Sequence, residues 1–245
     1  MSIIRALLFQ IGMYLATIVI IGLSPLMLPF PYSLRYRYLI QWGKFVLWWL
    51  KLTCNLDYRV EGRENVPDET VIIMSKHQST YETIALQSIF PSQTWILKRE
   101  LLWVPFFGWG LKMMQAVAID RKAGKKALKQ VIEQGTARLK AGLCVVIFPE
   151  GTRTLPGERR KYAIGGAMLA QKSGFPIIPV AHNAGMFWAK GQFVKNPGTI
   201  TFVIGPRIDS HGKRADEINQ IAEEWIESTS LALSHLGNSA SSNIS

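Results

Sequence analysis

TVIIMSKHQSTYE (residues 70–82) joins a short apolar run to a polar turn and the start of a helix. The β-branched and apolar side chains of residues 70–75 are typical of a buried strand. The Ser79-x-x-Glu82 spacing that follows marks a helix N-terminus. We therefore expect His77 to lie in the turn between a strand and a helix.

His77 and Glu82 are five positions apart. Within one continuous helix, two such side chains point about 140° apart around the axis. With His77 in the turn and Glu82 in the first helical turn, the two can meet, which predicts a histidine–carboxylate pair. The alternative is structural: Glu82 closes a capping box with Ser79, and His77 is an ordinary polar loop residue.

The composition narrows the class of protein. The 245 residues suffice for one large core, or for one domain with an appendage. A net charge of +11 and a pI near 9.8 favour anionic partners. Eight Trp residues and no recognised nucleic-acid-binding signature favour phosphate-bearing lipid and a membrane surface over nucleic acid.

The cysteines and histidines give no sign of a metal site. Cys54 and Cys144 lie among apolar neighbours without the spacing of metal ligands. We expect two reduced thiols, with a disulfide between them as the alternative. Four scattered His residues form no Cys/His cluster, so we expect no metal.

The first 56 residues differ in character from the rest. Ala6–Phe30 carries no charge, and Ala6–Leu23 has nearly the length of a membrane-spanning helix. The absence of an Ala-x-Ala-like cleavage site favours a retained anchor over a secretory signal peptide. Basic residues flank the apolar stretch on both sides, so a re-entrant or interfacial hairpin fits as well as a span. The aromatic-rich segment Tyr38–Leu56 suits the headgroup boundary, with an amphipathic core helix as the alternative.

From residue 57 onward, short strand patterns alternate with helical ones. The expected strands are 57–60, 70–75, 94–98, 116–119, 143–148, 177–180 and 199–204. The expected helices are 79–90, 105–114, 124–140, 165–173 and 216–236. This alternation predicts an α/β fold: a central, mostly parallel sheet flanked by helices, preceded by a membrane-associated helical segment. The expected domains are anchoring helices 1–56, an α/β domain 57–236 and a disordered tail 237–245.

Phe148-Pro149-Glu150-Gly151-Thr152-Arg153 follows the strand pattern 143–148. In open α/β sheets, ligands gather beyond the carboxyl ends of the strands. Gly151 permits positive φ or close approach, and Arg153 offers a two-pronged donor for phosphate. The alternative is a Pro-Gly turn that carries an exposed arginine.

Two further cations stand at strand ends. Arg121 follows the strand pattern 116–119, and Lys98 ends the pattern 94–98. Each could face His77 across a cleft, and cations that converge there suit a phosphate monoester. Asp120 and Arg121 could equally belong to a solvated loop.

Taken in this order, the motifs resemble those of the glycerolipid acyltransferases, the bacterial lysophosphatidic acid acyltransferases in particular. The family pattern consists of His-x4-Asp, a block that ends in Arg, Phe-Pro-Glu-Gly-Thr-Arg, and a Val/Ile-Pro-Val block. The corresponding residues are 77–82, 117–121, 148–153 and 177–180, and the resemblance extends over roughly residues 57–207. The chain departs from the pattern in Glu82, where most of the family has Asp. Gln115 and Ala118 also replace the usual Gly and Phe of the second block.

The resemblance implies transfer of a fatty acyl group from acyl-CoA or acyl carrier protein to the free sn-2 hydroxyl of lysophosphatidic acid, giving phosphatidic acid. It implies His77 as the general base and Glu82 as the acid that orients it. Arg121, Arg153 and Lys98 would hold the phosphate, and Glu150 and Gly151 would shape the turn that presents Arg153.

The resemblance further implies no cofactor beyond the acyl donor as co-substrate, membrane lipids as partners, and a site on the cytoplasmic side of a bacterial cytoplasmic membrane. One alternative is an acyltransferase for another lyso-lipid or for glycerol phosphate. The other is a non-catalytic protein that binds anionic lipid surfaces. The latter accounts for the charge and the N-terminus, but not for four ordered blocks at strand ends.

Overall fold

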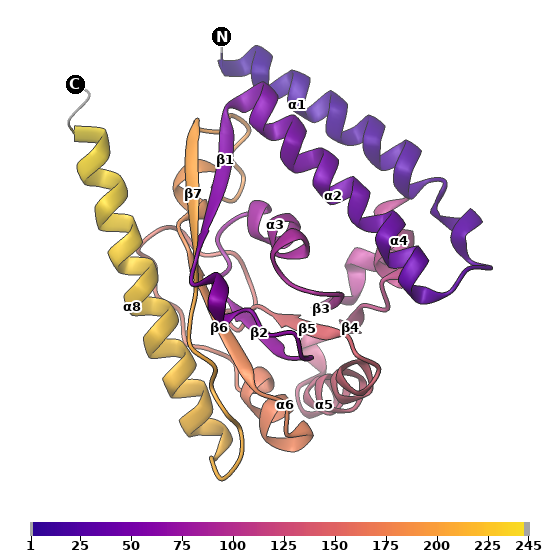
Figure 1. Cartoon of the computed structure of the whole chain (residues 1–245), viewed down its shortest axis with the longest axis vertical. Helices are drawn as coiled ribbons and strands as arrows, with labels where there is room; N and C mark the ends of the chain where they lie inside the picture. Colours follow the sequence, from indigo (N-terminus) through magenta and orange to yellow (C-terminus); the bar gives the residue numbers. More distant parts are fainter. Residues whose placement is uncertain (1, 243–245) are drawn as a thin grey trace.

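The apolar run of the opening motif forms β2 (Ile72–Ser75), the middle strand of a seven-stranded sheet. The computed structural model describes residues 2–242, with side chains described through His235. The strand order is β1-β7-β6-β2-β5-β3-β4 (Figure 1). The other strands are β1 (Leu56–Glu61), β3 (Gln93–Lys98), β4 (Val117–Ile119), β5 (Cys144–Ile147), β6 (Ile177–His182) and β7 (Gly198–Ile204).

The strands from β6 to β4 pair in parallel, and β6 and β7 pair antiparallel. β1 in turn pairs in parallel with β7. The expected α/β fold with a central, mostly parallel sheet is therefore confirmed. The strands also lie within two residues of their expected ends.

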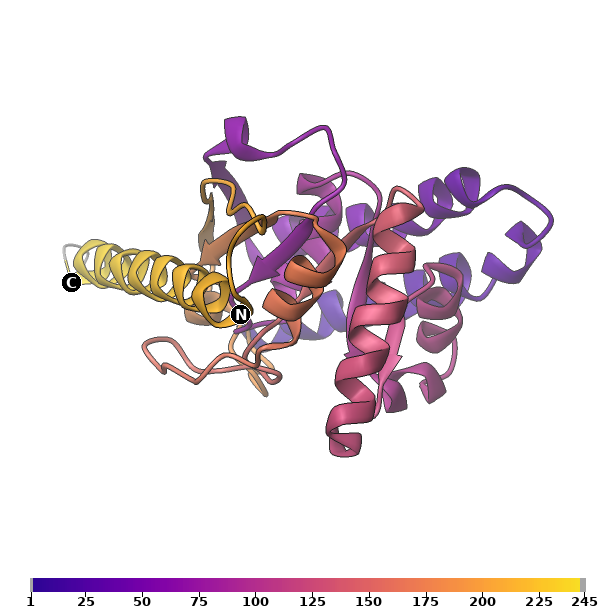
Figure 2. The same ribbon diagram turned by 90° about the horizontal axis from the view of Figure 1, so that it is seen from below.

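Successive side chains of β2 point to opposite faces of the sheet, which creates two cores. Ile73 packs toward α3 (Tyr81–Ile89) and the N-terminal helices, whereas Ile72 and Met74 pack into the core on the other face. The helices on this second face are α5 (Lys125–Lys140), α6 (Gly165–Ser173) and α8 (Ala215–Ser242). Figure 2 shows α6 between α5 and α8. Every residue of β2 is buried, as expected for a strand covered on both faces.

The N-terminal segment forms an antiparallel helical hairpin that lies over one face of the domain (Figure 1). α1 (Ser2–Ala16) continues through two shorter helical turns, Thr17–Ile21 and Ser24–Met27, and α2 (Tyr32–Cys54) runs back beside it. Two hydrogen bonds join the helices: Trp42 Nε1 donates to Thr17 Oγ1 (2.9 Å), and Trp49 Nε1 donates to the Leu8 carbonyl (3.1 Å). The Trp49 indole passes so close to Gly12 that a Cβ there would overlap it.

The two helices of the hairpin differ in what they cover. Ser2–Met27 is long and apolar enough to cross a membrane, and only 22% of its most apolar window is buried inside the protein. α2 instead buries Leu39, Val46 and Leu50 in the domain core, while Trp48 remains 56% exposed. The segment expected at the headgroup boundary is therefore also a core helix, so it combines features of the two alternatives. Position relative to a membrane stays a prediction.

The C-terminal helix is longer than its sequence pattern indicates. α8 continues to Ser242, so the tail expected to be disordered from Gly237 begins inside a helix, and residues 243–245 lie outside the described part. A glycine costs a helix only about 1 kcal/mol, which is too little to end it without a cap. Cys54 and Cys144 are both buried and free, as expected.

We predict that the two faces of α2 respond differently to truncation. Leu50→Ala removes a side chain that is 1% exposed, and it should lower the free energy of unfolding by about 2–5 kcal/mol. Leu52→Ala, at 63% exposure on the same helix, should change it by less than about 0.5 kcal/mol. Thermal unfolding in detergent measures both, and equal effects would show that α2 is not part of the core.

Candidate active site

The polar motifs meet because β2, β5, β3 and β4 are neighbours that run in the same direction. The residues that follow these strands therefore emerge at one edge of the sheet. His77, Lys98, Arg121 and Arg153 all line one cavity of about 250 Å³ there. Four of the seven expected site residues thus share a cavity, and the other three lie directly around it.

Glu82 connects the helix start to the histidine. Its carboxylate is fully buried, and Oε1 lies 2.8 Å from His77 Nδ1. The same oxygen accepts hydrogen bonds from the backbone amides of Gln78 (3.0 Å) and Ser79 (2.8 Å). Glu82 therefore has features of both interpretations: it accepts amides at the N-terminus of α3, and it pairs with His77. The Ser79 hydroxyl accepts the Tyr81 amide instead of the Glu82 amide, so the reciprocal bond of a capping box is not formed.

This geometry defines the tautomer of His77. Because a carboxylate oxygen accepts and does not donate, Nδ1 carries the proton and Nε2, across the ring, presents its lone pair. Burial tends to raise the pKa of Glu82, but the electrostatic effect of the nearby His182, together with the His77 imidazole and the Ser79 amide that hydrogen-bond to it, outweighs burial and holds that pKa below its usual value. Glu82 is therefore ionised at neutral pH.

His182, at the end of β6, has the opposite tautomer. Its Nε2 lies 2.8 Å from the Lys76 carbonyl, and its Nδ1 accepts the Ala184 amide (3.2 Å). Burial lowers the pKa of this fully enclosed imidazole, which keeps it neutral. The sequence shows only a histidine after an apolar strand, so nothing in it pointed to this contact with the residue beside His77.

The turn after β5 fixes His77 from the other side. Phe148 stacks on the imidazole with ring centroids 4.1 Å apart. Glu150 Oε1 accepts the His77 amide (3.0 Å), and the Thr154 amide donates to the His77 carbonyl (2.8 Å). Glu150 is itself 5% exposed, and burial raises its pKa against the opposing charge of Lys76. Glu150 therefore holds the backbone of His77 and does not itself line the cavity.

The two arginines complete the wall, and Gly151, which does not line the cavity, holds one of them. Gly151 has φ of +70°, the left-handed conformation that glycine adopts without strain, and its carbonyl accepts a hydrogen bond from Arg121 Nη1. Partial burial lowers the pKa of Arg121, with Glu100 opposing the shift. Arg153 Nη1 donates to Thr80 Oγ1 (3.0 Å). Each guanidinium has five N–H donors, so donors remain for a ligand.

Lys98 is held less firmly than the arginines. Its ammonium pairs with Glu100 at 3.3 Å, and both side chains are about half exposed. The remaining wall is largely apolar and comes from the hairpin, β3, α4 (Phe107–Met113) and α3, which adds the polar side chains of Thr83 and Gln87. A cavity that combines guanidinium groups with apolar side chains suits an amphiphilic anion. Among residues 2–242, no group of three or more His, Cys, Asp or Glu side chains could hold a metal ion.

Comparison with known proteins agrees with this arrangement. A family model described as Acyltransferase matches residues 57–183, which include every strand-end motif described above. The chain belongs to the acyltransferase family. The matched region begins in β1 and ends just after β6.

Individual relatives of this acyltransferase extend the match beyond the motifs. It is 45% identical over 208 residues to 1-acyl-sn-glycerol-3-phosphate acyltransferase of Pseudomonas aeruginosa, covering 83% of this chain and 81% of that protein. The Saccharomyces cerevisiae protein of the same name is 30% identical, over 79% of this chain and 65% of its own length. The crystal structure of the 1-acyl-sn-glycerophosphate (LPA) acyltransferase PlsC from Thermotoga maritima superposes with a TM-score of 0.78. That match has 27% identity and covers 95% of this chain and 98% of that one.

The two buried hydrogen-bond patterns predict distinct histidine spectra. In ¹⁵N-histidine-labelled enzyme at a pH where the rings are neutral, His77 should be protonated at Nδ1 and His182 at Nε2. The resonances that disappear from the spectrum of His77→Ala belong to the two ring nitrogens of His77. Protonation of neutral His77 at Nε2 would contradict the hydrogen bond to Glu82.

Proposed function

We propose that this acyltransferase moves a fatty acyl group from acyl-CoA or acyl carrier protein to the sn-2 hydroxyl of lysophosphatidic acid, giving phosphatidic acid. One observation carries the proposal: the paired His77 and the guanidinium groups of Arg121 and Arg153 line the same cavity. The names of the Pseudomonas aeruginosa and Thermotoga maritima relatives support the same acceptor.

His77 acts as the general base in this proposal. An alcohol is a weak nucleophile near neutral pH, so Nε2 removes the hydroxyl proton as the oxygen attacks the thioester carbonyl. Glu82 holds the ring in the required tautomer and stabilises the imidazolium that forms. The tetrahedral intermediate then collapses: the C–S bond breaks, the ester remains, and the leaving thiolate takes the proton from His77.

The acceptor's phosphate is the group that the cations would bind. Arg121 and Arg153 provide directional donor pairs, whereas Lys98, already paired with Glu100, contributes a more weakly held charge. Glu150 and Gly151 act indirectly, because the first supports the His77 backbone and the second accepts from Arg121. In this mechanism the enzyme has no nucleophile of its own and no cofactor, since the acceptor supplies the attacking oxygen.

The hairpin supports a location at a membrane. Its apolar, largely unburied α1 would lie in the lipid, and both substrate classes carry acyl chains. We place the site on the cytoplasmic side of a bacterial cytoplasmic membrane, where the acyl donors are available. The antiparallel return of α2 to the domain favours an interfacial or re-entrant hairpin over a span.

We predict that His77→Ala lowers kcat for acyl transfer to lysophosphatidic acid by about 100-fold or more, because a general base contributes that much. His211→Ala, on an exposed loop, is the matched control and should keep full activity. Purified protein in detergent micelles, with acyl-CoA or acyl carrier protein as donor, provides the assay. Near-normal turnover in His77→Ala would overturn the mechanism, and a panel of lyso-lipids and glycerol phosphate identifies the acceptor.

Arg153→Ala should raise the KM for the phosphorylated acceptor by about tenfold or more while changing the donor KM little, because a charge-assisted hydrogen bond to phosphate is lost. Arg153→Lys should restore only part of the affinity, since an ammonium lacks the planar two-pronged donor. Arg99→Ala, at an exposed pair with Asp120, is the control. Equal increases in both KM values would exclude a phosphate-specific role.

A further inference from the structure

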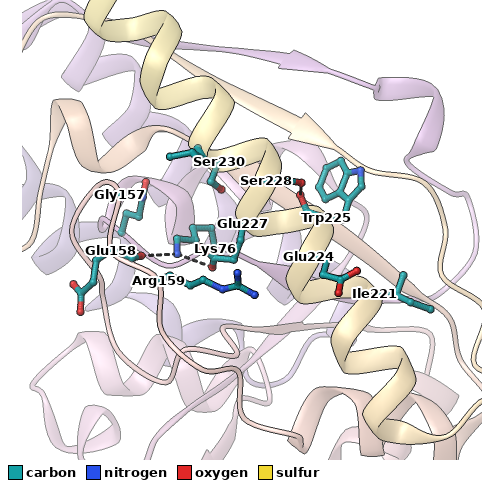
Figure 3. A pocket seen from close by; sticks show the side chains of 12 residues that line it. Lys76, Gly157, Glu158, Arg159, Ile221, Glu224, Trp225, Glu227, Ser228 and Ser230 are labelled. Atoms are coloured by element: carbon teal, nitrogen blue, oxygen red, sulfur yellow. Dashed lines mark hydrogen bonds and ion pairs between the residues drawn. The ribbon is translucent and has the colours of Figure 1, made fainter.

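Lys76, the residue before His77, has one of the most enclosed charged side chains of the described chain, at 2% exposure. Its ammonium contacts Glu227 Oε1 at 2.8 Å and the Glu158 carbonyl at 3.1 Å (Figure 3). A third oxygen, Glu150 Oε1, lies 3.5 Å away. Glu227 belongs to α8, far from the other site residues in sequence. A buried ammonium depends on such partners because it has lost its water.

Glu150 connects this cluster to His77. The oxygen that lies 3.5 Å from Lys76 also accepts the His77 amide at 3.0 Å. Lys76 and the His77 backbone therefore share one acceptor. A Lys76 ammonium that moved onto Glu150 would draw this oxygen toward itself and away from the amide that fixes the base.

Glu227 has the shorter contact with Lys76 and so holds the ammonium away from Glu150. The same Glu227 oxygen accepts the Tyr162 hydroxyl at 2.9 Å, which fixes the carboxylate in turn. α8 and the loop of Gly157–Arg159 enclose a cleft of about 680 Å³, and both Lys76 and Glu227 line it (Figure 3). The contact thus links the C-terminal helix to the backbone of the histidine turn.

We propose that Glu227 is a positioning residue for catalysis: by holding Lys76, it leaves Glu150 to fix the backbone of His77. This inference rests on the proposed function, in which His77 is the general base. Without the Glu227 charge, Lys76 moves onto its remaining carboxylate, the Glu150–His77 bond lengthens, and the imidazole leaves its productive position. Substrate binding at Arg121 and Arg153 is unaffected.

The test is Glu227→Gln in the detergent-solubilised full-length enzyme. We expect kcat to fall about tenfold or more, because small displacements of a catalytic group have effects of that size, with both KM values within about twofold of wild type. Glu224→Gln is the matched control: it lies on α8 in the same cleft, exposed and hydrogen-bonded to Gln220. It should behave as wild type.

A double-mutant cycle, in which kcat is compared between single and double variants, separates a positioning role of Glu227 from an effect on stability. If Glu227 acts through Lys76, Glu227→Gln should have no further effect on kcat in a Lys76→Met background, and Glu227→Asp should recover part of the loss. Three results would overturn the inference. The first is an unchanged kcat in Glu227→Gln, and the second is losses of kcat that add up in the double variant. The third is a loss of activity no larger than the loss of folded protein. Should Glu227→Gln not fold, kcat of Glu227→Asp decides, with a wild-type value counting against positioning.

The wild type and His77→Ala are measured in the same assay. A wild type that transfers no acyl group to any acceptor in the panel overturns the proposed function itself. An active wild type with an equally active Glu227→Gln overturns only the role of Glu227.

Discussion

The carboxylate of Glu82 is the point on which the site depends. One buried oxygen accepts from the amides of Gln78 and Ser79 and from the imidazole of His77. The same carboxylate oxygen therefore both satisfies the amides at the start of α3 and fixes the orientation of the histidine. Because three donors converge on it, the charge of Glu82 is stabilised in a place where an isolated carboxylate would be expensive. A Glu in place of the more usual Asp fits here because the side chain reaches back to amides three and four residues earlier.

The sheet brings the remaining groups to this point. Parallel neighbours end at one edge, so His77 and Arg153, which are 76 positions apart in the sequence, line one cavity. The backbone at His77 is held at two points: Glu150, in the turn after β5, accepts the His77 amide, and His182 of β6 contacts the carbonyl of the preceding Lys76. A base held in this way needs little reorganisation before it accepts a proton.

The strands and the clustering of strand-end cations could be predicted because both depend on local patterns: short apolar runs, and the polar residues directly after them. Other features depend on contacts distant in sequence and left no such pattern. The antiparallel pairing of β7 with β6, the stacking of Phe148 on His77 and the contact of His182 with Lys76 belong to this group. Glu150 was assigned to the correct turn, but its contact with the His77 amide needed the packing of two strands. The end of α8 was missed because a single glycine is a weak stop signal.

The hairpin has a consequence for selectivity. α2 belongs to the core, and Ile21, Leu39 and Trp42 of the hairpin also form part of the cavity wall. The surface that would meet lipid is thus joined rigidly to the surface that meets the substrate, without a flexible linker between them. In the proposed location, with α1 embedded in the lipid, His77 would stand at a set depth relative to the bilayer. An acceptor anchored by its own acyl chain would then react only if its hydroxyl reached that depth, so the bilayer itself would contribute to the choice of acceptor.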